Sequence, residues 1–210
     1  MSSSVERKRI RKSPAARRAE IVASAAAIAL SEGLEGITLR RIGDDLDVRP
    51  GLVSHYFPSA EELVAEAFGT AATAELDALI PAERSTGTPT EHLARFLART
   101  TGDPAWDDIS ALWINARHLG RHRPALRAQV AEQEAAWRAR LSNLIADGVD
   151  RGEFRTPDPV VVALQILVVL DGLSADGTLT PEELPPAVAR MAITTAEREL
   201  SLPPGTLGAP

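Results

Sequence analysis

The sequence predicts an all-α protein with a small N-terminal helical domain and a larger C-terminal helical domain. Three observations support this fold class. First, 44% of the 210 residues are hydrophobic and 25% are charged, which is typical of globular proteins. Second, the strong helix formers Ala, Leu, Glu and Arg are abundant. Third, segments with apolar residues at helical spacing are separated by Pro and Gly, and no internal repeat is present.

The predicted elements follow in chain order. Ser13 and Pro14 are typical of the cap and first turn of an opening helix, which follows a basic, flexible arm. A loop rich in Ser, Thr, Gly and Pro is expected over 82–89. The later helices are expected over 59–80, 90–100, 103 or 104–120, 124–151, 157–173 and 181–200. The arm, the N-terminal domain, the C-terminal domain and a tail are therefore placed at 1–13, 14–58, 59–202 and 203–210.

The segment 38–57 predicts two short helices joined by a tight turn. Thr38 can cap the first helix with its hydroxyl. Asp47 ends this helix, and Val48 can fill the angle between the two helices. The apolar positions of the first helix recur at steps of three and four and share one face: Leu39, Ile42 and Leu46.

The second short helix begins at Pro50, whose fixed φ is already helical and whose missing N–H is not needed there. It must end near Phe57, because a residue before a proline, here Pro58, is disfavoured in the helical region. Ser59 and Glu62 have the spacing of a capping box and open the next helix. This arrangement is a helix-turn-helix, whose second helix enters the DNA major groove in many proteins.

The charge distribution is consistent with a DNA-binding N-terminal domain. Residues 1–58 carry ten Lys and Arg against seven Asp and Glu, net +3, whereas the remaining residues carry thirteen against twenty-two, net −9. A basic arm on an acidic body binds phosphates while limiting nonspecific adhesion. The alternative is that the arm is only a solvated tail. The arm residues expected to reach the DNA backbone or the minor groove are Arg7, Lys8, Arg9, Arg11 and Lys12.

Four motifs lie within residues 14–68: RRAEIV at 17–22, EGLEG at 32–36, VRPG at 48–51 and SHYFPSAEEL at 54–63. With these motifs, the segment resembles the TetR family of one-component bacterial transcriptional regulators. The segment GLVSHYF at 51–57 is most similar to the BetI-like, choline-responsive subgroup. One departure is Gly43, where the family usually has Ala. Because glycine costs a helix about 1 kcal/mol relative to alanine, we expect a less rigid first helix.

The resemblance implies that the second helix enters the major groove and that Tyr56 binds a phosphate. The helix N-terminus near Thr38 also attracts anions. The second helix contains no Arg, Asn or Gln, so direct readout depends on Leu52 against thymine methyl groups and on Arg49 at the edge. The alternative is that Leu52, Val53 and Phe57 are core residues and Tyr56 is merely on the surface. The candidate contacts are Thr38, Arg40, Arg41, Arg49, Pro50, Gly51, Leu52, Ser54, His55 and Tyr56.

An effector pocket is predicted from the tryptophans and two acidic residues. Trp106 and Trp113 share one helical face, and Trp137 lies on the next predicted helix. Glu134 and Asp171 can supply negative charge beside aromatic faces, which suits a cationic effector such as a choline-like or polyamine-like molecule. The alternative is that the tryptophans are ordinary core, Asp171 caps a turn and Glu134 is solvated.

The predicted helix 157–173 is apolar nearly all round, so it should be buried on several sides. The resemblance implies a homodimer in which this helix and the last helix pack against their copies around a two-fold axis. The alternative is a monomer that buries the helix in its own core. The candidate interface residues are Leu164, Val168, Val188 and Met191.

Several other classes of protein are excluded or disfavoured. No cysteine is present, so disulfides and thiolate chemistry are impossible. The N-terminus lacks an apolar secretion signal, and the longest apolar stretch, 159–170, is too short to span a membrane, so a cytoplasmic protein is expected. No catalytic motif is evident, and neither an enzyme nor a cofactor is predicted.

Two patterns only imitate metal sites. His118 and His122 have the spacing of helical metal ligands, but Gly120 indicates that the helix is ending, so a solvated basic turn with Arg117, Arg121 and Arg123 is expected. Segment 172–183 imitates half of a calcium loop without an acidic first ligand. No metal site is predicted.

The sequence therefore predicts a ligand-responsive, DNA-binding transcriptional regulator. Its expected partners are double-stranded DNA, a small-molecule effector and a second copy of the chain. We expect a repressor that a small molecule releases from a palindromic operator. Two alternatives are a constitutive DNA-binding protein without an effector and a small-molecule-binding protein with a degenerate DNA-binding head.

Overall fold

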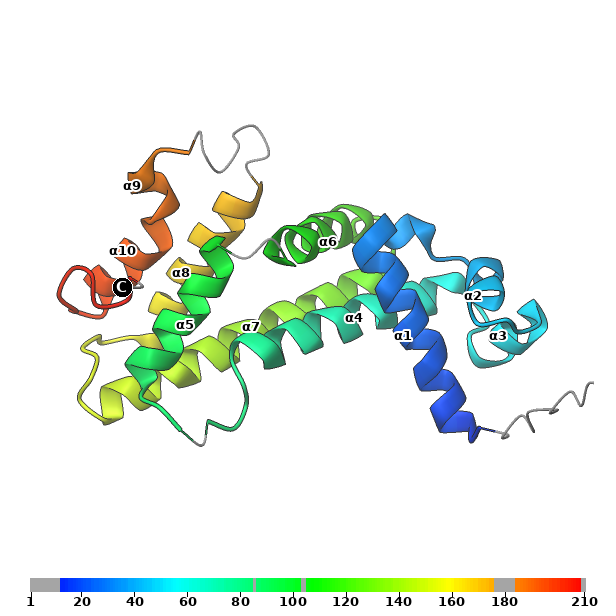
Figure 1. The fold of residues 1–210 in the computed structure, drawn as a ribbon, viewed down its shortest axis with the longest axis horizontal. Coiled ribbons are helices and arrows are strands. Elements are labelled where there is room, and N and C mark those ends of the chain that lie inside the picture. Colours follow the sequence, from blue (N-terminus) through cyan, green and yellow to red (C-terminus); the bar gives the residue numbers. More distant parts are fainter. Residues whose placement is uncertain (1–11, 85, 103–104, 176–183, 209–210) are drawn as a thin grey trace, which may run out of the picture.

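The computed structural model describes residues 12–208 apart from 85, 103–104 and 176–183, and its described residues form helices and no strand. The predicted all-α fold class is therefore confirmed. Two long helices, α4 and α7, lie along the middle of an elongated molecule (Figure 1). The helices are α1 Pro14–Glu32, η1 Leu34–Gly36, α2 Leu39–Asp45, α3 Pro50–Tyr56, α4 Ala60–Leu79, α5 Pro89–Gly102, α6 Ala105–Gly120, α7 Pro124–Asp150, α8 Pro159–Ala175, α9 Pro186–Ala189 and α10 Met191–Glu199.

The N-terminal helices begin at the residues that the capping pattern predicts. The side chains of Ser13, Thr38 and Ser59 each accept a hydrogen bond from the backbone N–H three residues later, at 3.1 to 3.4 Å. Each bond satisfies one of the amide groups that a helix N-terminus leaves without a partner. These caps fix the start of α1, α2 and α4.

The turn between α2 and α3 depends on two unusual backbone positions. Asp47 adopts a φ of 50°, the left-handed region that Asp tolerates better than most residues. Val48 N–H donates to the Gly43 carbonyl at 2.9 Å, and a Cβ on Gly43 would lie only 3.2 Å from the Val48 carbonyl oxygen and 3.4 Å from Pro50 Cα. Gly43 therefore allows α3 to approach α2 closely, a packing role that offsets its low helix propensity.

The buried side chains form two cores joined by the α4–α7 pair. One core packs α1, α2 and α3 against the first half of α4 and against α6, and it includes Phe57 and Phe68. The other core lies between α5, α7, α8 and α10 and includes Phe96 and Phe154. Trp113 on α6 packs against both cores. Trp113 therefore lies where the two cores meet.

The C-terminal segment differs from the sequence expectation. The single helix predicted over 181–200 is wrong within the described residues, because the chain is extended at Pro185, whose ψ is 135°. A residue that precedes a proline, here Pro186, is disfavoured in the helical region, so α9 can begin only after it. The helix breaks again at Arg190 before α10. Residues 181–183 lie outside the described part of the chain.

The last described residues, predicted as a tail, fold back onto the C-terminal core. Leu207 is fully buried among core side chains, and its N–H donates to the buried Glu197 carboxylate at 2.9 Å. Arg155 N–H donates to the Leu200 carbonyl at 3.0 Å, which ties the loop after α7 to the end of α10. The C-terminal segment therefore belongs to the C-terminal domain.

Candidate DNA-binding surface and effector pocket

Helix α3 is anchored by one face and presents the other to solvent. Val53 is buried on its inner side and Phe57, directly after the helix, is buried too. Leu52 and Tyr56 are half-buried, and Tyr56 packs against the N-terminal core. The candidate DNA contacts that are exposed are Thr38, Arg40, Arg41, Arg49, Pro50, Gly51, Ser54 and His55.

The outer face of α3 has few polar groups available for bases. Ser54 Oγ donates to the Pro50 carbonyl of its own helix at 3.2 Å. The rings of His55 and Tyr56 are 5.3 Å apart at an interplanar angle of 80°, so the imidazole supports the phenol ring edge-on. A Cβ on Gly51 would meet no atom within 4 Å, so a ligand can approach this backbone closely.

Most arginines of the helix-turn-helix already have acidic partners. Arg41 pairs with Glu32 at 2.7 Å, and Arg40 lies 3.9 Å from Asp44. The same holds for Arg17 with Glu20 and for Arg18 with Glu66. Within residues 14–58, Arg49 is the arginine for which the described residues supply no acidic partner.

Arg49 is exposed and occupies the N-cap position of α3. It is thus the cation of this domain that is free to meet a phosphate or a base edge without first breaking an ion pair.

The arm residues fall mostly outside the described part of the chain, namely Arg7, Lys8, Arg9 and Arg11. Lys12 is described and pairs with Glu20 on α1. The hydrogen bond from the Lys12 ammonium lowers the pKa of the Glu20 carboxyl. Lys12 therefore lies beside the second turn of α1.

Helices α6, α7 and α8 line a partly open cavity of about 230 Å³. Four of the five residues predicted for the effector pocket line it together: Trp113, Glu134, Trp137 and Asp171. The side chain of the fifth, Trp106, lies outside the described residues. Leu164 and Val168, predicted for the dimer interface, also line this cavity.

The cavity also contains Arg117, which sequence reasoning assigned to a solvated turn. That assignment is wrong, because Arg117 is half-buried and donates from Nε to Glu134 Oε1 at 3.0 Å and from Nη2 to Asp171 Oδ2 at 2.9 Å. Its guanidinium carbon lies 5.2 Å from the centroid of the Trp113 ring. The sequence did contain one indication of this position. Arg117 follows Trp113 by four residues, which places the two side chains on one helical face.

Trp113 connects the cavity to α4, the helix that follows the helix-turn-helix. Its indole N–H donates to Glu75 Oε2 on α4 at 3.1 Å, and its ring meets the Phe68 ring of α4 edge-on at 5.0 Å. The other carboxylate oxygen of Glu75 is inaccessible to solvent and has no hydrogen-bond partner among the described residues. Burial raises the pKa of Glu75 to about 7, while the hydrogen bond from Trp113 opposes the rise.

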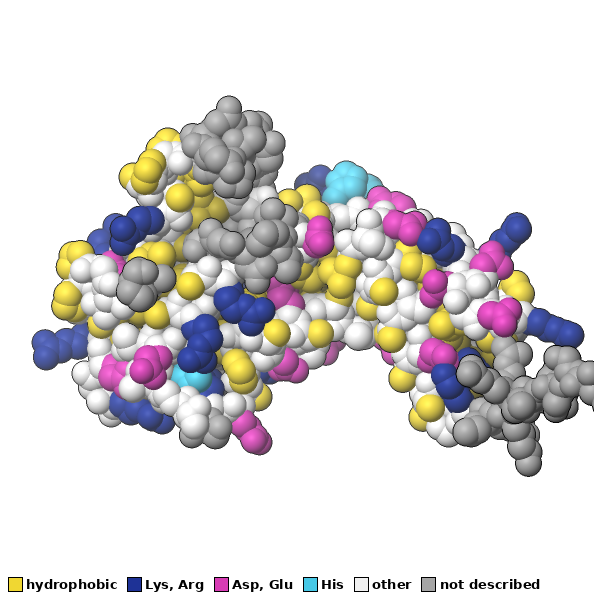
Figure 2. Space-filling view, in the orientation of Figure 1, with side chains coloured by type: hydrophobic (Ala, Val, Ile, Leu, Met, Phe, Trp, Pro, Cys, Tyr) yellow, Lys and Arg dark blue, Asp and Glu magenta, His cyan; other side chains and the backbone are white. Residues whose placement is uncertain are grey.

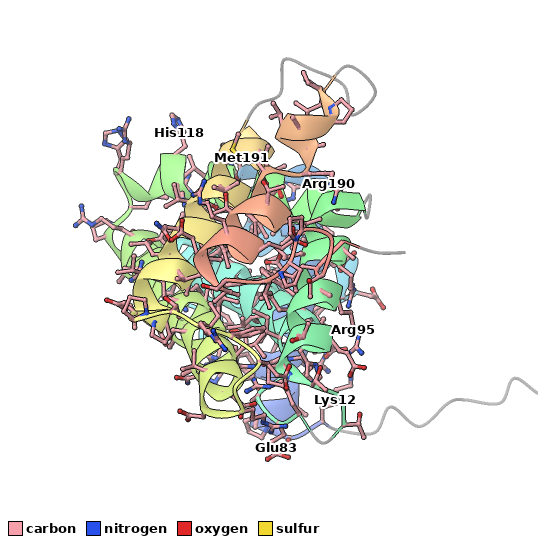
Figure 3. All side chains as sticks on the ribbon, turned by 90° about the vertical axis from the view of Figure 1, so that its left-hand side faces the viewer. Lys12, Glu83, Arg95, His118, Arg190 and Met191 are labelled. Carbon is pink, nitrogen blue, oxygen red and sulfur yellow. The ribbon has the colours of Figure 1, made fainter. Side chains whose placement is uncertain are left out.

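The outer face of α8 leaves large apolar side chains in solvent. Val168 is 60% exposed and Leu164 46%, and Val160 and Val161 continue the same exposed face. Met191 on α10 is exposed as well, whereas Val188 on α9 is half-buried. Figure 3 shows Met191 and Arg190 at the end of the molecule that faces away from the helix-turn-helix, and Figure 2 shows hydrophobic side chains around α9 and α10.

The histidine pair does not form a metal site. His118 and His122 are both exposed, α6 ends at Gly120 between them, and Figure 3 shows His118 on the outside of the molecule. Among the described residues, no three His, Asp or Glu side chains come together as metal ligands. The calcium-loop imitation at 172–183 lies mainly outside the described residues. None of the described helices has the length and apolar character needed to span a bilayer.

These features define a helical regulator with a DNA-binding head and a pocket in its body. Residues 21–67 match the family model for bacterial regulatory proteins of the tetR family, and residues 89–200 match the model for the C-terminal domain of BetI-type transcriptional repressors. The chain therefore belongs to the TetR family of DNA-binding transcriptional regulators and has a BetI-type C-terminal domain. Membership in this family makes it a regulator and not an enzyme. No curated protein matches the chain.

Solved structures share the fold at low sequence identity. A TetR transcription regulator from Haloarcula marismortui is 21% identical with a TM-score of 0.72, over 89% of this chain and 99% of that one. E. coli NemR in its reduced form is 16% identical with a TM-score of 0.72, over 89% and 98%. A transcriptional regulator from Saccharomonospora viridis, in complex with choline, is 16% identical with a TM-score of 0.69, over 89% and 98%.

Proposed function

We propose that this protein is a homodimeric repressor that binds a palindromic operator through α3 and releases it when a small organic cation occupies the cavity between α6, α7 and α8. The observation that carries this proposal is the position of Trp113. One side chain lines the cavity and is hydrogen-bonded to α4, the helix that begins directly after the DNA-binding domain.

The proposed DNA contacts are those of the exposed side of α3. Arg49, which has no acidic partner among the described residues, would meet a phosphate or a base edge at the start of α3. Leu52 would supply apolar contact with thymine methyl groups, and Tyr56 a hydroxyl for a phosphate. Arg40 and Arg41 form exposed ion pairs with Asp44 and Glu32, and because such pairs are weak, both arginines remain proposed DNA contacts.

The proposed dimer interface is the exposed apolar face of α8 together with Met191 of α10. Soluble monomers rarely expose a contiguous face of this kind. A two-fold interface places two copies of α3 on one duplex, and successive major grooves require about 34–36 Å between them. Leu164 and Val168 belong to both this face and the cavity lining, so the partner subunit would lie beside the effector.

The proposed route from the cavity to DNA passes through α4. An effector that contacts the Trp113 ring would change its packing on Phe68 or its hydrogen bond to Glu75, and both of these residues are on α4. Because α4 carries the DNA-binding domain at its N-terminus, a small shift changes the spacing of the two α3 helices. The effector needs only to bind the altered arrangement better than the DNA-competent one.

The proposed ligand class is a small organic cation. Two indole rings and two carboxylates line the cavity, and this combination attracts quaternary ammonium groups. The BetI-type C-terminal match and the choline complex of the Saccharomonospora viridis regulator support the same class.

Selection from randomised DNA, followed by fluorescence anisotropy on the selected fragment, tests the DNA-binding part of the proposal. Adding choline then tests release. The variant Trp113→Phe keeps an aromatic ring in the cavity but removes the indole N–H that Glu75 accepts. We expect it to bind DNA and choline yet release DNA less completely. Release that remains complete in Trp113→Phe would contradict the proposed route, and failure to select any DNA would contradict the proposed function.

A further inference from the structure

The cation-binding groups of the cavity are already occupied by one side chain of the protein. Arg117 extends from α6 and donates to Glu134 on α7 and to Asp171 on α8, at 3.0 and 2.9 Å. Its guanidinium also lies over Trp113, 5.2 Å from the ring centroid. A single arginine thus joins the three helices that form the cavity.

These contacts are the ones that an organic cation would make. A quaternary ammonium group binds where an aromatic face and a negative charge converge. In this cavity Trp113 offers the face and Glu134 and Asp171 offer the charge, and Arg117 uses all three. With Arg138 also in the lining, the ionised side chains of the cavity sum to no net charge.

We propose that Arg117 is an internal competitor, and that an organic cation binds by displacing its guanidinium from Glu134 and Asp171. The inference rests on the proposed function, because it concerns regulation of the same cavity. Displacement changes the bridge between α6, α7 and α8 at the moment of binding. It therefore converts occupation of the cavity into a change in helix packing beside Trp113.

The burial of the three side chains permits this exchange. Arg117 and Glu134 each keep 35% of their side-chain surface in solvent, and Asp171 keeps 54%. Ion pairs with this much exposure are weak, because water and salt stabilise the separated charges. A released guanidinium can also extend into solvent from α6 while its aliphatic stem stays on the apolar surface. Arg117 therefore competes with a ligand without excluding it.

An anionic ligand is the opposite possibility, since Arg117 and Arg138 both line the cavity. The geometry disfavours it, because the Nε and Nη2 donors of Arg117 are committed to carboxylates. The two possibilities predict opposite effects of removing the arginine. An anion would bind more weakly to such a variant, whereas a cation would bind more tightly.

Calorimetric titration with choline and with tetramethylammonium tests the proposal on the full-length protein. Arg117→Gln removes the competing charge, and we expect the dissociation constant to fall about tenfold, as expected for loss of two weak ion pairs. Arg117→Lys retains the charge but cannot bridge two carboxylates in the same way, so an intermediate value is expected. Arg121→Gln is the matched control, because it removes an exposed arginine that does not line the cavity and makes no ion pair with the described residues, and it should bind less than threefold differently.

A second measurement does not depend on the variants. In the wild-type protein, choline should shift the side-chain Nε–H resonance of Arg117 and speed its exchange with water.

A third test removes the carboxylates together with the arginine. The combined variant Arg117→Gln with Glu134→Gln and Asp171→Asn should lose the choline affinity that Arg117→Gln alone gains. Circular dichroism and the unfolding midpoint of each variant establish that it folds.

Equal or weaker choline binding by Arg117→Gln overturns the proposal, as does an Arg117 resonance that choline leaves unchanged. If neither choline nor tetramethylammonium binds to the wild-type protein or to Arg117→Gln, the proposal is overturned too. In that case Glu134 and Asp171 bind no organic cation even without the guanidinium of Arg117. DNA binding by each protein is measured separately by anisotropy. A protein that binds choline as expected but binds no DNA therefore contradicts the proposed function and leaves the role of Arg117 intact.

Discussion

Glu75 should make the stability of this protein fall as the pH rises from about 4.5 to about 7. In the unfolded chain the carboxyl has its ordinary pKa of 4.5, whereas burial raises the pKa of Glu75 to about 7 in the folded protein. Between these two values the folded state retains a proton that the unfolded state has released. This contribution to the free energy of unfolding is fully present below the lower pKa and is lost as the pH passes the upper one.

The size of the effect follows from the two pKa values. Each pKa unit corresponds to about 1.4 kcal/mol, so a rise from 4.5 to about 7 amounts to about 3 kcal/mol of stability. The cause is local: among the residues that the structure describes, buried Oε1 of Glu75 has no hydrogen-bond partner and Oε2 accepts only the N–H of Trp113. A carboxylate in that position is poorly compensated when it ionises.

Glu75→Gln tests this account. The amide oxygen of glutamine can still accept from Trp113, and the side chain does not titrate. Urea unfolding of the variant and the wild-type protein is compared from about pH 5 to about pH 8.5 at one protein concentration, because dimerisation would also change apparent stability. We expect similar stability at the acid end and an advantage of up to about 3 kcal/mol for the variant at the alkaline end.

The difference between the two curves cancels all other titrating groups. Glu132→Gln removes an exposed carboxylate from α7 and controls for the loss of one charge. A difference between wild type and Glu75→Gln that stays constant over the whole range would refute the reasoning. So would a difference that the Glu132→Gln variant reproduces.

Three further predictions concern single positions. Arg49→Ala should weaken binding to all DNA sequences and reduce the salt dependence by about one unit of slope per subunit, and an unchanged slope in anisotropy titrations would exclude the contact. Asp47→Ala should be about 1 kcal/mol less stable than Asp47→Gly, because only the alanine has a Cβ in the left-handed region, and equal unfolding midpoints would contradict this. Gly148→Ala should lower stability by about 1–3 kcal/mol, because the new Cβ would lie 2.2 Å from the Phe154 ring. Its control, Gly172→Ala on α8, meets no atom within 4 Å and should be neutral or stabilising.

The sequence predicted most helix boundaries because they are set by local signals. A hydroxyl at Thr38 or Ser59 and a proline at Pro50 act within one turn, so their effect does not depend on the rest of the fold. The signal for the start of α9 is equally local, because the consecutive prolines at 185 and 186 predict a break in the helix there. The burial of Leu207 had no such signal, since it depends on a core assembled from distant helices.

The pocket was predictable only in part, because some of its features follow from local helical periodicity and others depend on tertiary packing. Helical periodicity places Trp113 and Ile109 on one face, but periodicity cannot say which helix that face meets. The pairing of Arg117 with Glu134 and Asp171 depends on how α6, α7 and α8 cross, and the contact of Trp113 with Glu75 depends on the position of α4. These contacts depend on tertiary packing, which helical periodicity does not predict. The sequence alone therefore placed Arg117 in a solvated turn.

The position of α8 suggests why the effector and the dimer should act on each other. Leu164 and Val168 line the cavity and also belong to the exposed apolar face that the proposed partner covers. A ligand that displaces Arg117 from Asp171 changes the restraint on α8 from the cavity side, while a second subunit would restrain the same helix from the outside. Linkage is reciprocal, so a dimer that fixes α8 must alter ligand affinity by the same factor by which the ligand alters dimerisation. Ligand affinity measured above and below the dimer dissociation constant should therefore differ, and equal affinity in both ranges would separate the cavity from the interface.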